Sequence, residues 1–271
     1  MSELQFARLD EEAQLKVLYQ LCFPEDDPAF WDWIFRCVYD PQNTLVLREN
    51  GRIVASLQML PCEMQLGAKH YAAHYIYAAS TLPERQGRGL MGKLLAQAEE
   101  EGRRRGHAFS VLITQEDSLL QYYARFGYRG RLCIGQMPPQ QADFSEKQNC
   151  RTAVPQDIPA LSALYERATT GMLCGLRDEI FWLRQLELFG QGAWVLEIAG
   201  RVEAYAFADE RGVMEASGTA AGQLSAYICP GKVWRTIPAG QGRPMGSIKP
   251  LQEKYREVME QNPCFLNLMY N

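Results

Sequence analysis

The stretch from His74 to Leu95 joins an apolar strand to an amphipathic helix, and this junction constrains the fold more than any other part of the sequence. The helix is predicted by apolar residues that recur about every 3.6 residues: Leu90, Leu94, Leu95 and Ala98. Between the strand and the helix lie a proline and a loop with three glycines: Gly87, Gly89 and Gly92. The first backbone N–H groups of a helix lack intrahelical partners and lie at the positive end of its dipole, so this junction is suited to bind an anion.

Three cations surround the start of this helix: Arg85, Arg88 and Lys93. A cation at a helix N-terminus is unfavourable by roughly 0.3–1 kcal/mol unless an anion neutralises it. This conflict favours a bound phosphate. A tight strand-to-helix connection without a ligand is the alternative.

The glycine spacing is compatible with more than one kind of phosphate loop. Gly87, Gly89 and Gly92 match the dinucleotide pattern Gly-x-Gly-x-x-Gly, but they follow three strand-like segments and no repeating βαβ pattern comes after them. A triphosphate loop would end in Gly-Lys-Ser/Thr, which the sequence lacks. The segment Gln86-Gly87-Arg88-Gly89 instead resembles the pyrophosphate loop of the GNAT superfamily of acyl-CoA-dependent N-acyltransferases, with Met91 where that family has a small residue.

The predicted secondary structure of the first 140 residues agrees with this resemblance. Asn50-Gly51 between two apolar runs is a strong hairpin signal. The patterns predict helices at residues 10–21, 28–39, 90–105 and 118–125, and strands at 45–47, 53–64, 71–80, 109–114 and 132–137. This order predicts an α/β protein with a mixed central sheet flanked by helices, which is the order of the GNAT fold.

The second half of the chain repeats features of the first at nearly one offset. Residues 195–204 echo 46–55, residues 161–165 echo 15–19, and residues 181–182 echo 30–31. These matches predict a degenerate duplication. They divide the chain into an acyl-CoA-binding catalytic GNAT domain at residues 1–140, a polar linker over 138–149, and a degenerate GNAT-like domain at 150–271 without a glycine loop. Chance similarity between two α/β segments is the alternative.

A functional GNAT domain followed by a degenerate one is similar to the enhanced-intracellular-survival branch of the superfamily. That branch also has Leu-Met after the glycines, as in Leu90-Met91 here. Its members commonly carry a further sterol-carrier-like domain, which we expect this chain to lack.

The resemblance implies acetyl-CoA as the cofactor and assigns residues to its two ends. The end of the strand would present backbone N–H groups to the pantetheine and thioester through Ala79, Ser80 and Thr81. The loop and the helix start would hold the pyrophosphate through Arg85, Gln86, Gly87, Arg88, Gly89, Leu90, Met91 and Gly92.

The segment Tyr122-Tyr123-Ala124-Arg125-Phe126-Gly127-Tyr128 resembles a second motif of the GNAT superfamily. In many GNAT proteins the tyrosine that Tyr123 matches lies beside the thioester sulfur. A tyrosine, with a reference pKa of about 10, is suited to protonate a leaving thiolate. The resemblance therefore implies Tyr123 as general acid. Because Tyr122 and Tyr123 are adjacent, one of them must face inward, and a core role for Tyr123 is the alternative.

The sequence offers several candidates for the general base that would deprotonate the amine. His74 is chemically the best candidate because its reference pKa is about 6.5, although a lone histidine in a strand more often has a structural role. The other candidates from the sequence are Tyr75, Tyr77, Glu116 and Asp117. The related branch adds the terminal carboxylate, here that of Asn271, and water chains could make a base unnecessary.

Together these features predict an N-acetyltransferase that moves an acetyl group from acetyl-CoA to a primary amine by direct attack. The acceptor would be a small polyamine, an aminoglycoside-like compound or a lysine side chain. Acidic residues Glu25, Asp26 and Asp27 near the expected cleft mouth favour a cationic amine, unless they only form a solvated helix start. The alternative is a non-catalytic acyl-CoA-binding module whose second domain recruits a partner, and a dinucleotide enzyme is a third reading.

Composition excludes other classes of function. The net charge of −4 provides no basic field for nucleic acid, and no apolar run reaches the length of a membrane span. The first residues lack the features of an export signal, so we expect a cytoplasmic protein. Eight cysteines without a Cys-x-x-Cys pair predict no metal site and no redox motif. The oligomeric state is open, and a homo-oligomer is compatible with the sequence.

Overall fold

The computed structural model describes residues 2–114, 116–141, 148–238, 240, 242–267 and 270. The elements of the first half are β1 (Ser2–Phe6), α1 (Glu12–Cys22), α2 (Pro28–Cys37), β2 (Thr44–Glu49), β3 (Arg52–Leu66), β4 (Lys69–Thr81), α3 (Leu90–Arg104), β5 (Phe109–Ile113), α4 (Asp117–Ala124) and β6 (Arg129–Met137). Apart from β1, which the residue patterns did not predict, their order agrees with the predicted one.

The second half contains more short strands than the first. Its elements are β7 (Gln148–Thr152), α5 (Ile158–Ala168), β8 (Leu173–Gly175), α6 (Glu179–Phe189), β9 (Ala193–Ile198), β10 (Arg201–Asp209), β11 (Gly212–Gly218), α7 (Ala221–Ile228), β12 (Trp234–Thr236), β13 (Arg243–Pro250), α8 (Arg256–Gln261) and β14 (Cys264–Phe265). Only residues 219–220 connect β11 to α7, so this strand-to-helix junction has no counterpart of the glycine loop that precedes α3.

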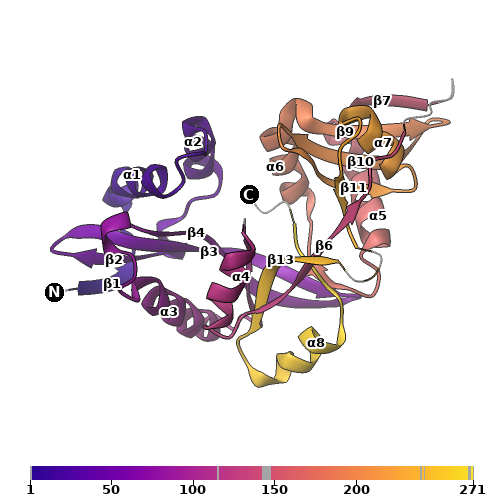
Figure 1. Ribbon diagram of the computed structural model, residues 1–271. Coiled ribbons are helices and arrows are strands. Elements are labelled where there is room, and N and C mark those ends of the chain that lie inside the picture. Colours follow the sequence, from indigo (N-terminus) through magenta and orange to yellow (C-terminus); the bar gives the residue numbers. More distant parts are fainter. Residues whose placement is uncertain are drawn as a thin grey trace.

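The strands form one continuous sheet in the order β1-β2-β3-β4-β5-β13-β6-β12-β11-β10-β9-β7. The sheet is mixed, because β3 and β4 pair antiparallel whereas β4 and β5 pair parallel. Figure 1 shows α1 and α2 on one face of the first half of the sheet and α3 on the other. This confirms the predicted α/β architecture with a central sheet between helices.

Strand β13 comes from the second half of the chain but lies inside the first half of the sheet. It pairs antiparallel with β5 through residues such as Ile248, which is opposite Val111, and with β6 on its other side (Figure 1). The predicted division at residues 140 and 150 stays a prediction about the sequence. In space, the first half of the sheet is completed by residues from beyond that division.

The internal repeat reappears as two turns of the same kind. In the β2–β3 hairpin, Asn50 and Gly51 have φ values of 53° and 80°. In the β9–β10 hairpin, Ala199 and Gly200 have φ values of 49° and 76°. Two successive residues with positive φ are typical of the tight type I′ turn that suits the twist of a hairpin. The same turn at the two matching places favours a duplication.

Buried apolar side chains form three clusters, and the first of them also includes residues of the second half such as Ile248 of β13. In the first half they lie between the sheet and the helices α1, α2 and α3. In the second half one cluster lies under α5 and α6 and another under α7. None of the helices that the structure describes has the length and apolar character needed to cross a lipid bilayer.

Replacement of Ala199 by asparagine is expected to stabilise the protein by roughly 0.5–1 kcal/mol, because asparagine tolerates the left-handed region better than alanine does. The reverse change at the matching turn, Asn50→Ala, should destabilise it by a similar amount. Urea unfolding measures both. A loss of stability in Ala199→Asn would contradict the described turn.

Candidate active site

The loop before α3 has the backbone conformation of an anion-binding turn. Gly87 and Gly89 have φ values of 73° and 72°, and Gly89 is the residue that caps α3. A Cβ atom at either glycine would meet nothing within 4 Å, so glycine is required by the backbone conformation and not by crowding. The loop is therefore open on its outer side, where the free N–H groups at the start of α3 lie.

The cations of this loop differ in their surroundings. Arg85 Nε lies 2.9 Å from Glu49 Oε2, which ties the loop to β2. Arg88 and Lys93 are exposed, and none of the described residues forms an ion pair with them. These two side chains are therefore available to an anion, whereas Arg85 is already neutralised.

The other four predicted loop residues make contacts that hold the loop in place. Leu90 and Met91 are buried in the apolar core, so only their backbone can face a ligand. A Cβ atom at Gly92 would lie 2.9 Å from Cε1 of Phe126, so glycine here lets α3 approach the end of α4. Gln86 Nε2 donates a hydrogen bond to the carbonyl oxygen of Thr81 at 3.3 Å, which holds the loop on the end of β4.

Strands β4 and β5 separate before β4 ends. Their parallel pairing stops at Tyr75 and Val111, while β4 continues to Thr81. Beyond this point β4 is kept in place by β3, with which it pairs up to Thr81. The edge of β4 that faces β5 is thus left unpaired along its last residues, and such backbone groups need another partner.

A β-bulge lies in this separated part of β4. Ser56 and Gln58 of β3 pair with Ser80 and Tyr77, so that Ala78 and Ala79 lie opposite a single residue. Ala78 has a φ of 47°, which is unusual for a residue with a side chain. The buried Ser80 hydroxyl donates to the Ala78 carbonyl oxygen at 3.0 Å and holds this bulge.

The opening between β4 and β5 leads into a cleft of about 1200 Å³. Its walls come from both halves of the chain: the loop before α2, β4, β5 and α4 on one side, and β10, β11, β12 and β13 on the other. Ala78, Ala79 and Tyr123 all line this cleft. The separated strand end and the tyrosine predicted as general acid therefore meet in one space.

Tyr123 is 9% exposed and packs edge-on against Tyr122 and Tyr128, with ring centroids 5.2 and 5.9 Å away. Burial raises the pKa of Tyr123, and the neighbouring Tyr122 adds to this shift. No described residue forms a hydrogen bond with its hydroxyl group. The hydroxyl therefore keeps its proton at neutral pH and is free to donate it to a group in the cleft.

His74 lies on the other face of β4, away from the cleft. Side chains alternate along a strand, and Tyr75 and Tyr77 occupy the cleft face with their rings 5.9 Å apart. His74 is fully buried against α3, with Nδ1 3.0 Å from Nδ1 of His107. Burial and the charges of His107 and Arg105 lower the pKa of His74 to about 3. A general base must reach the proton it removes, so the structure does not support His74 in this role.

The other candidate bases differ in whether they line the cleft. Tyr75, Tyr77 and Asp117 line the cleft, whereas Glu116 does not. Asp117 is paired with Arg243, whose Nη2 lies 2.8 Å from its Oδ1. The carboxylate of Asn271 lies outside the described residues.

The three acidic residues before α2 all line the cleft, as expected for its mouth. Asp27 caps α2 by accepting a hydrogen bond from the Ala29 N–H at 2.8 Å. Asp26 is half-buried, and burial raises its pKa while the charge of Arg211 opposes this shift. Asp26 is thus a carboxylate in the cleft whose pKa is changed by its surroundings. The sequence pattern alone did not distinguish Asp26 from Glu25 and Asp27.

Aromatic side chains form a wall of the cleft beside Asp26. Tyr77 lies between Trp31 and Tyr270, with ring centroids 6.3 and 6.1 Å away. Tyr77 and Tyr270 both line the cleft, and Asp26 contributes to the raised pKa of Tyr77. Aromatic faces beside a carboxylate are suited to hold a cation. Tyr270 could not be assigned to this wall from sequence because it is distant from the other members along the chain.

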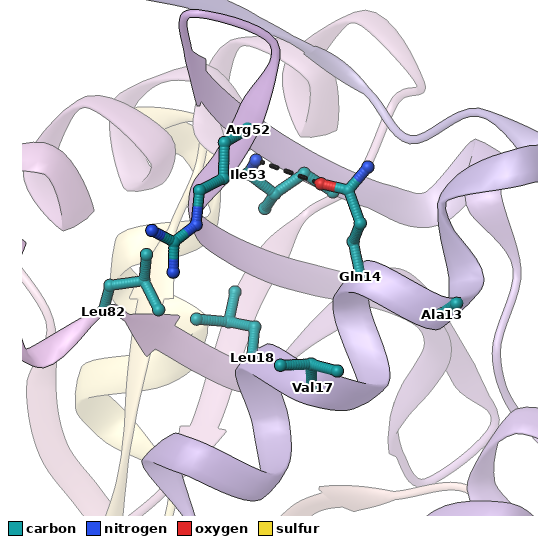
Figure 2. Close-up of a pocket in the computed structure, with 7 residues that line it drawn as sticks. All are labelled: Ala13, Gln14, Val17, Leu18, Arg52, Ile53 and Leu82. Carbon is teal, nitrogen blue, oxygen red and sulfur yellow. Dashed lines mark hydrogen bonds between the residues drawn. The ribbon is translucent and has the colours of Figure 1, made fainter.

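A smaller hollow of about 300 Å³ lies beside α1, on the β2–β3 hairpin side. Figure 2 shows its walls, which are mostly apolar side chains such as Val17, Leu18 and Ile53. Gln14 Oε1 accepts a hydrogen bond from the Ile53 N–H at 3.4 Å, so its polar group is already engaged. A ligand site usually has several polar groups that converge, and this hollow lacks such a set among the described residues.

Residues 3–130 match the family model of the acetyltransferase (GNAT) domain. This part of the chain is therefore similar to GNAT acetyltransferases, a class whose acetyl donor is acetyl-CoA. No curated protein matches the sequence.

Solved structures of similar fold cover nearly the whole chain. A probable N-acyltransferase from Enterococcus faecalis is 10% identical, with a TM-score of 0.67 over 92% of this chain and 71% of that one. Eis1 from Mycobacterium abscessus is 14% identical, with a TM-score of 0.64 over 96% and 76%. A tandem GNAT protein from the clavulanic acid biosynthesis pathway is 13% identical, with a TM-score of 0.55 over 92% and 99%. At these identities the likeness concerns the fold, a GNAT domain followed by a second GNAT-like half.

Replacement of Gly89 by alanine is expected to weaken coenzyme A binding at least about tenfold, because alanine loses roughly 1–2 kcal/mol in the left-handed region and the loop would leave its present conformation. Gly67→Ala is the matched control: Gly67 has a φ of 57° and open space around it, but it lies in the β3–β4 turn. Calorimetric titration with coenzyme A measures both. Equal affinities of the two variants would contradict an anion site at this loop.

Stability is expected to fall as the pH drops from about 6.5 toward about 3, because the unfolded His74 takes up a proton near its reference pKa while the folded one does so only near 3. In His74→Gln this part of the pH dependence should be lost. The exposed His70 provides the control variant His70→Gln. Urea unfolding between pH 7 and pH 4.5 measures the slopes, and an unchanged slope in His74→Gln would contradict the burial of a neutral His74.

Proposed function

We propose that this protein is an N-acetyltransferase that transfers an acetyl group from acetyl-CoA to a primary amine. The observation that carries the proposal is the separated edge of β4, which runs from the glycine loop at the start of α3 to the cleft that contains Tyr123. A long ligand with an anionic end and a reactive end fits a site of this shape. The family match concerns only residues 3–130, and the proposal assigns an acetyltransferase activity to the whole chain.

The residues around this path fit coenzyme A at both ends. The N–H groups that follow Gly87 and Gly89 would hold the diphosphate, with Arg88 and Lys93 as unpaired cations beside it. Ala79 at the bulge and the paired residues Ser80 and Thr81 would form the path for the pantetheine. Gly92, Leu90 and Met91 would support the loop from the core, and Arg85 would anchor it to β2.

The chemistry then falls to two side chains of the cleft. Acetyl-CoA supplies the acetyl group as an activated thioester. Tyr123 Oη, whose pKa burial raises, would retain its proton and give it to the leaving sulfur. The half-buried carboxylate of Asp26 would attract the amine and take up its proton, while the aromatic wall of Trp31, Tyr77 and Tyr270 orients the acceptor.

The test is the release of coenzyme A thiol from acetyl-CoA in the presence of a panel of primary amines. Amine-dependent release is expected, with the acetylated amine identified by mass spectrometry. If coenzyme A binds but no amine releases it, the protein is an acyl-CoA-binding module without transferase activity. If coenzyme A does not bind at all, both forms of the proposal fail.

Tyr123→Phe is expected to lower kcat at least about tenfold and to leave the affinity for coenzyme A nearly unchanged, because only the donated proton is lost. Tyr122→Phe is the matched control, since Tyr122 is adjacent but does not line the cleft. Steady-state kinetics and calorimetry give both quantities. A normal kcat in Tyr123→Phe would remove this residue from the mechanism.

A further inference from the structure

Three arginines line the part of the cleft that the second half contributes. Two of them are neutralised by carboxylates. Arg211 Nη2 lies 2.6 Å from Asp209 Oδ2, and Arg243 Nη2 lies 2.8 Å from Asp117 Oδ1. Arg235 differs from both, because none of the described residues forms an ion pair with it.

Arg235 lies on β12, which pairs with β6 so that Arg235 is opposite Gln136. Both residues line the cleft, and so does Met214. Arg235 Nη1 donates a hydrogen bond to Met214 Sδ at 3.8 Å. Arg235 is half-buried, and a thioether is a weak acceptor for a guanidinium group. Its donors are therefore poorly satisfied by the protein itself.

The surroundings make this unpaired charge unfavourable. Burial lowers the pKa of Arg235, and the charges of Arg211 and Arg243 lower it further, while Asp209 acts in the opposite direction. A partly desolvated cation without an ion-pair partner gains stability when an anion binds beside it. The wall of the cleft that the second half contributes is thus suited to bind an anionic group at Arg235.

The first-half wall has the opposite character. Glu25 and Asp26 line it, and no ion pair joins either of them to another described residue. The two walls approach each other closely enough for the charge of Arg211 to act on Asp26. The cleft therefore presents a carboxylate on one side and an unpaired guanidinium group on the other.

We propose that the acceptor amine carries an anionic group, a carboxylate or a phosphate, and that Arg235 binds it. This inference rests on the proposed transferase function and narrows its substrate class to zwitterionic amines. A guanidinium group suits such a partner because its N–H groups can bind two oxygens at once. The anion belongs to the acceptor and not to coenzyme A, since the residues of the glycine loop do not line this cleft.

The test uses pairs of amines that differ only in the anion. Lysine is compared with cadaverine, phenylalanine with phenethylamine, and phosphoethanolamine with ethanolamine. In the wild-type protein the best-used pair is expected to show a kcat/KM at least about tenfold higher for the anionic member. In Arg235→Gln this preference should disappear, while the KM for acetyl-CoA stays unchanged.

Two further variants separate binding from folding. Arg235→Lys keeps the charge without the paired donors and should retain part of the preference. Arg201→Gln removes an exposed arginine at the β9–β10 turn and should change nothing. Equal use of both members of every pair by the wild-type protein would overturn the inference. So would an unchanged preference in Arg235→Gln, or a change confined to the KM for acetyl-CoA.

A second measurement applies if no amine accepts an acetyl group, which would defeat the proposed function. Inorganic phosphate is titrated calorimetrically into the protein saturated with coenzyme A, so that the glycine loop is occupied. Phosphate should then bind to the wild-type protein at least about tenfold more tightly than to Arg235→Gln. Equal affinities would overturn the anion site at Arg235.

Discussion

The separation of β4 from β5 is the constraint on which the rest of the structure depends. Two strands that pair up to Tyr75 and Val111 must be held apart beyond these residues, because their backbone groups would otherwise pair with each other. Strand β3 holds β4 on one side, and β13 holds β5 on the other. The second half of the chain therefore helps to keep the opening that the glycine loop and the cleft share.

Much of this arrangement was predictable because its signals are local. The hairpin follows from Asn50-Gly51, and the central helix from its apolar spacing and the glycines before it. Strand β13 was not predictable in the same way, since Pro244 and Gly246 interrupt its pattern and its pairing with β6 shifts register on both sides of Gly246. Its partners β5 and β6 are more than a hundred residues earlier in the chain, and no local pattern encodes such a pairing.

The same distinction applies to the site. The motif around Tyr123 placed that residue in the cleft, and the pattern of acidic residues before α2 placed Asp26 there. His74 was assigned to the wrong surroundings because alternation along a strand predicts two faces but not which of them is the cleft. Arg235 lies on a strand of only three residues in the second half, so its role depends on how the halves meet.

The place of β13 also bears on how the molecule is made. A ribosome delivers the first half of the sheet well before β13, so during synthesis β5 and β6 have no strand between them. Contacts between segments so far apart in sequence form slowly, and exposed strand edges invite pairing with other chains. The nascent chain thus passes through a stage in which its sheet is incomplete and the edges of β5 and β6 are exposed.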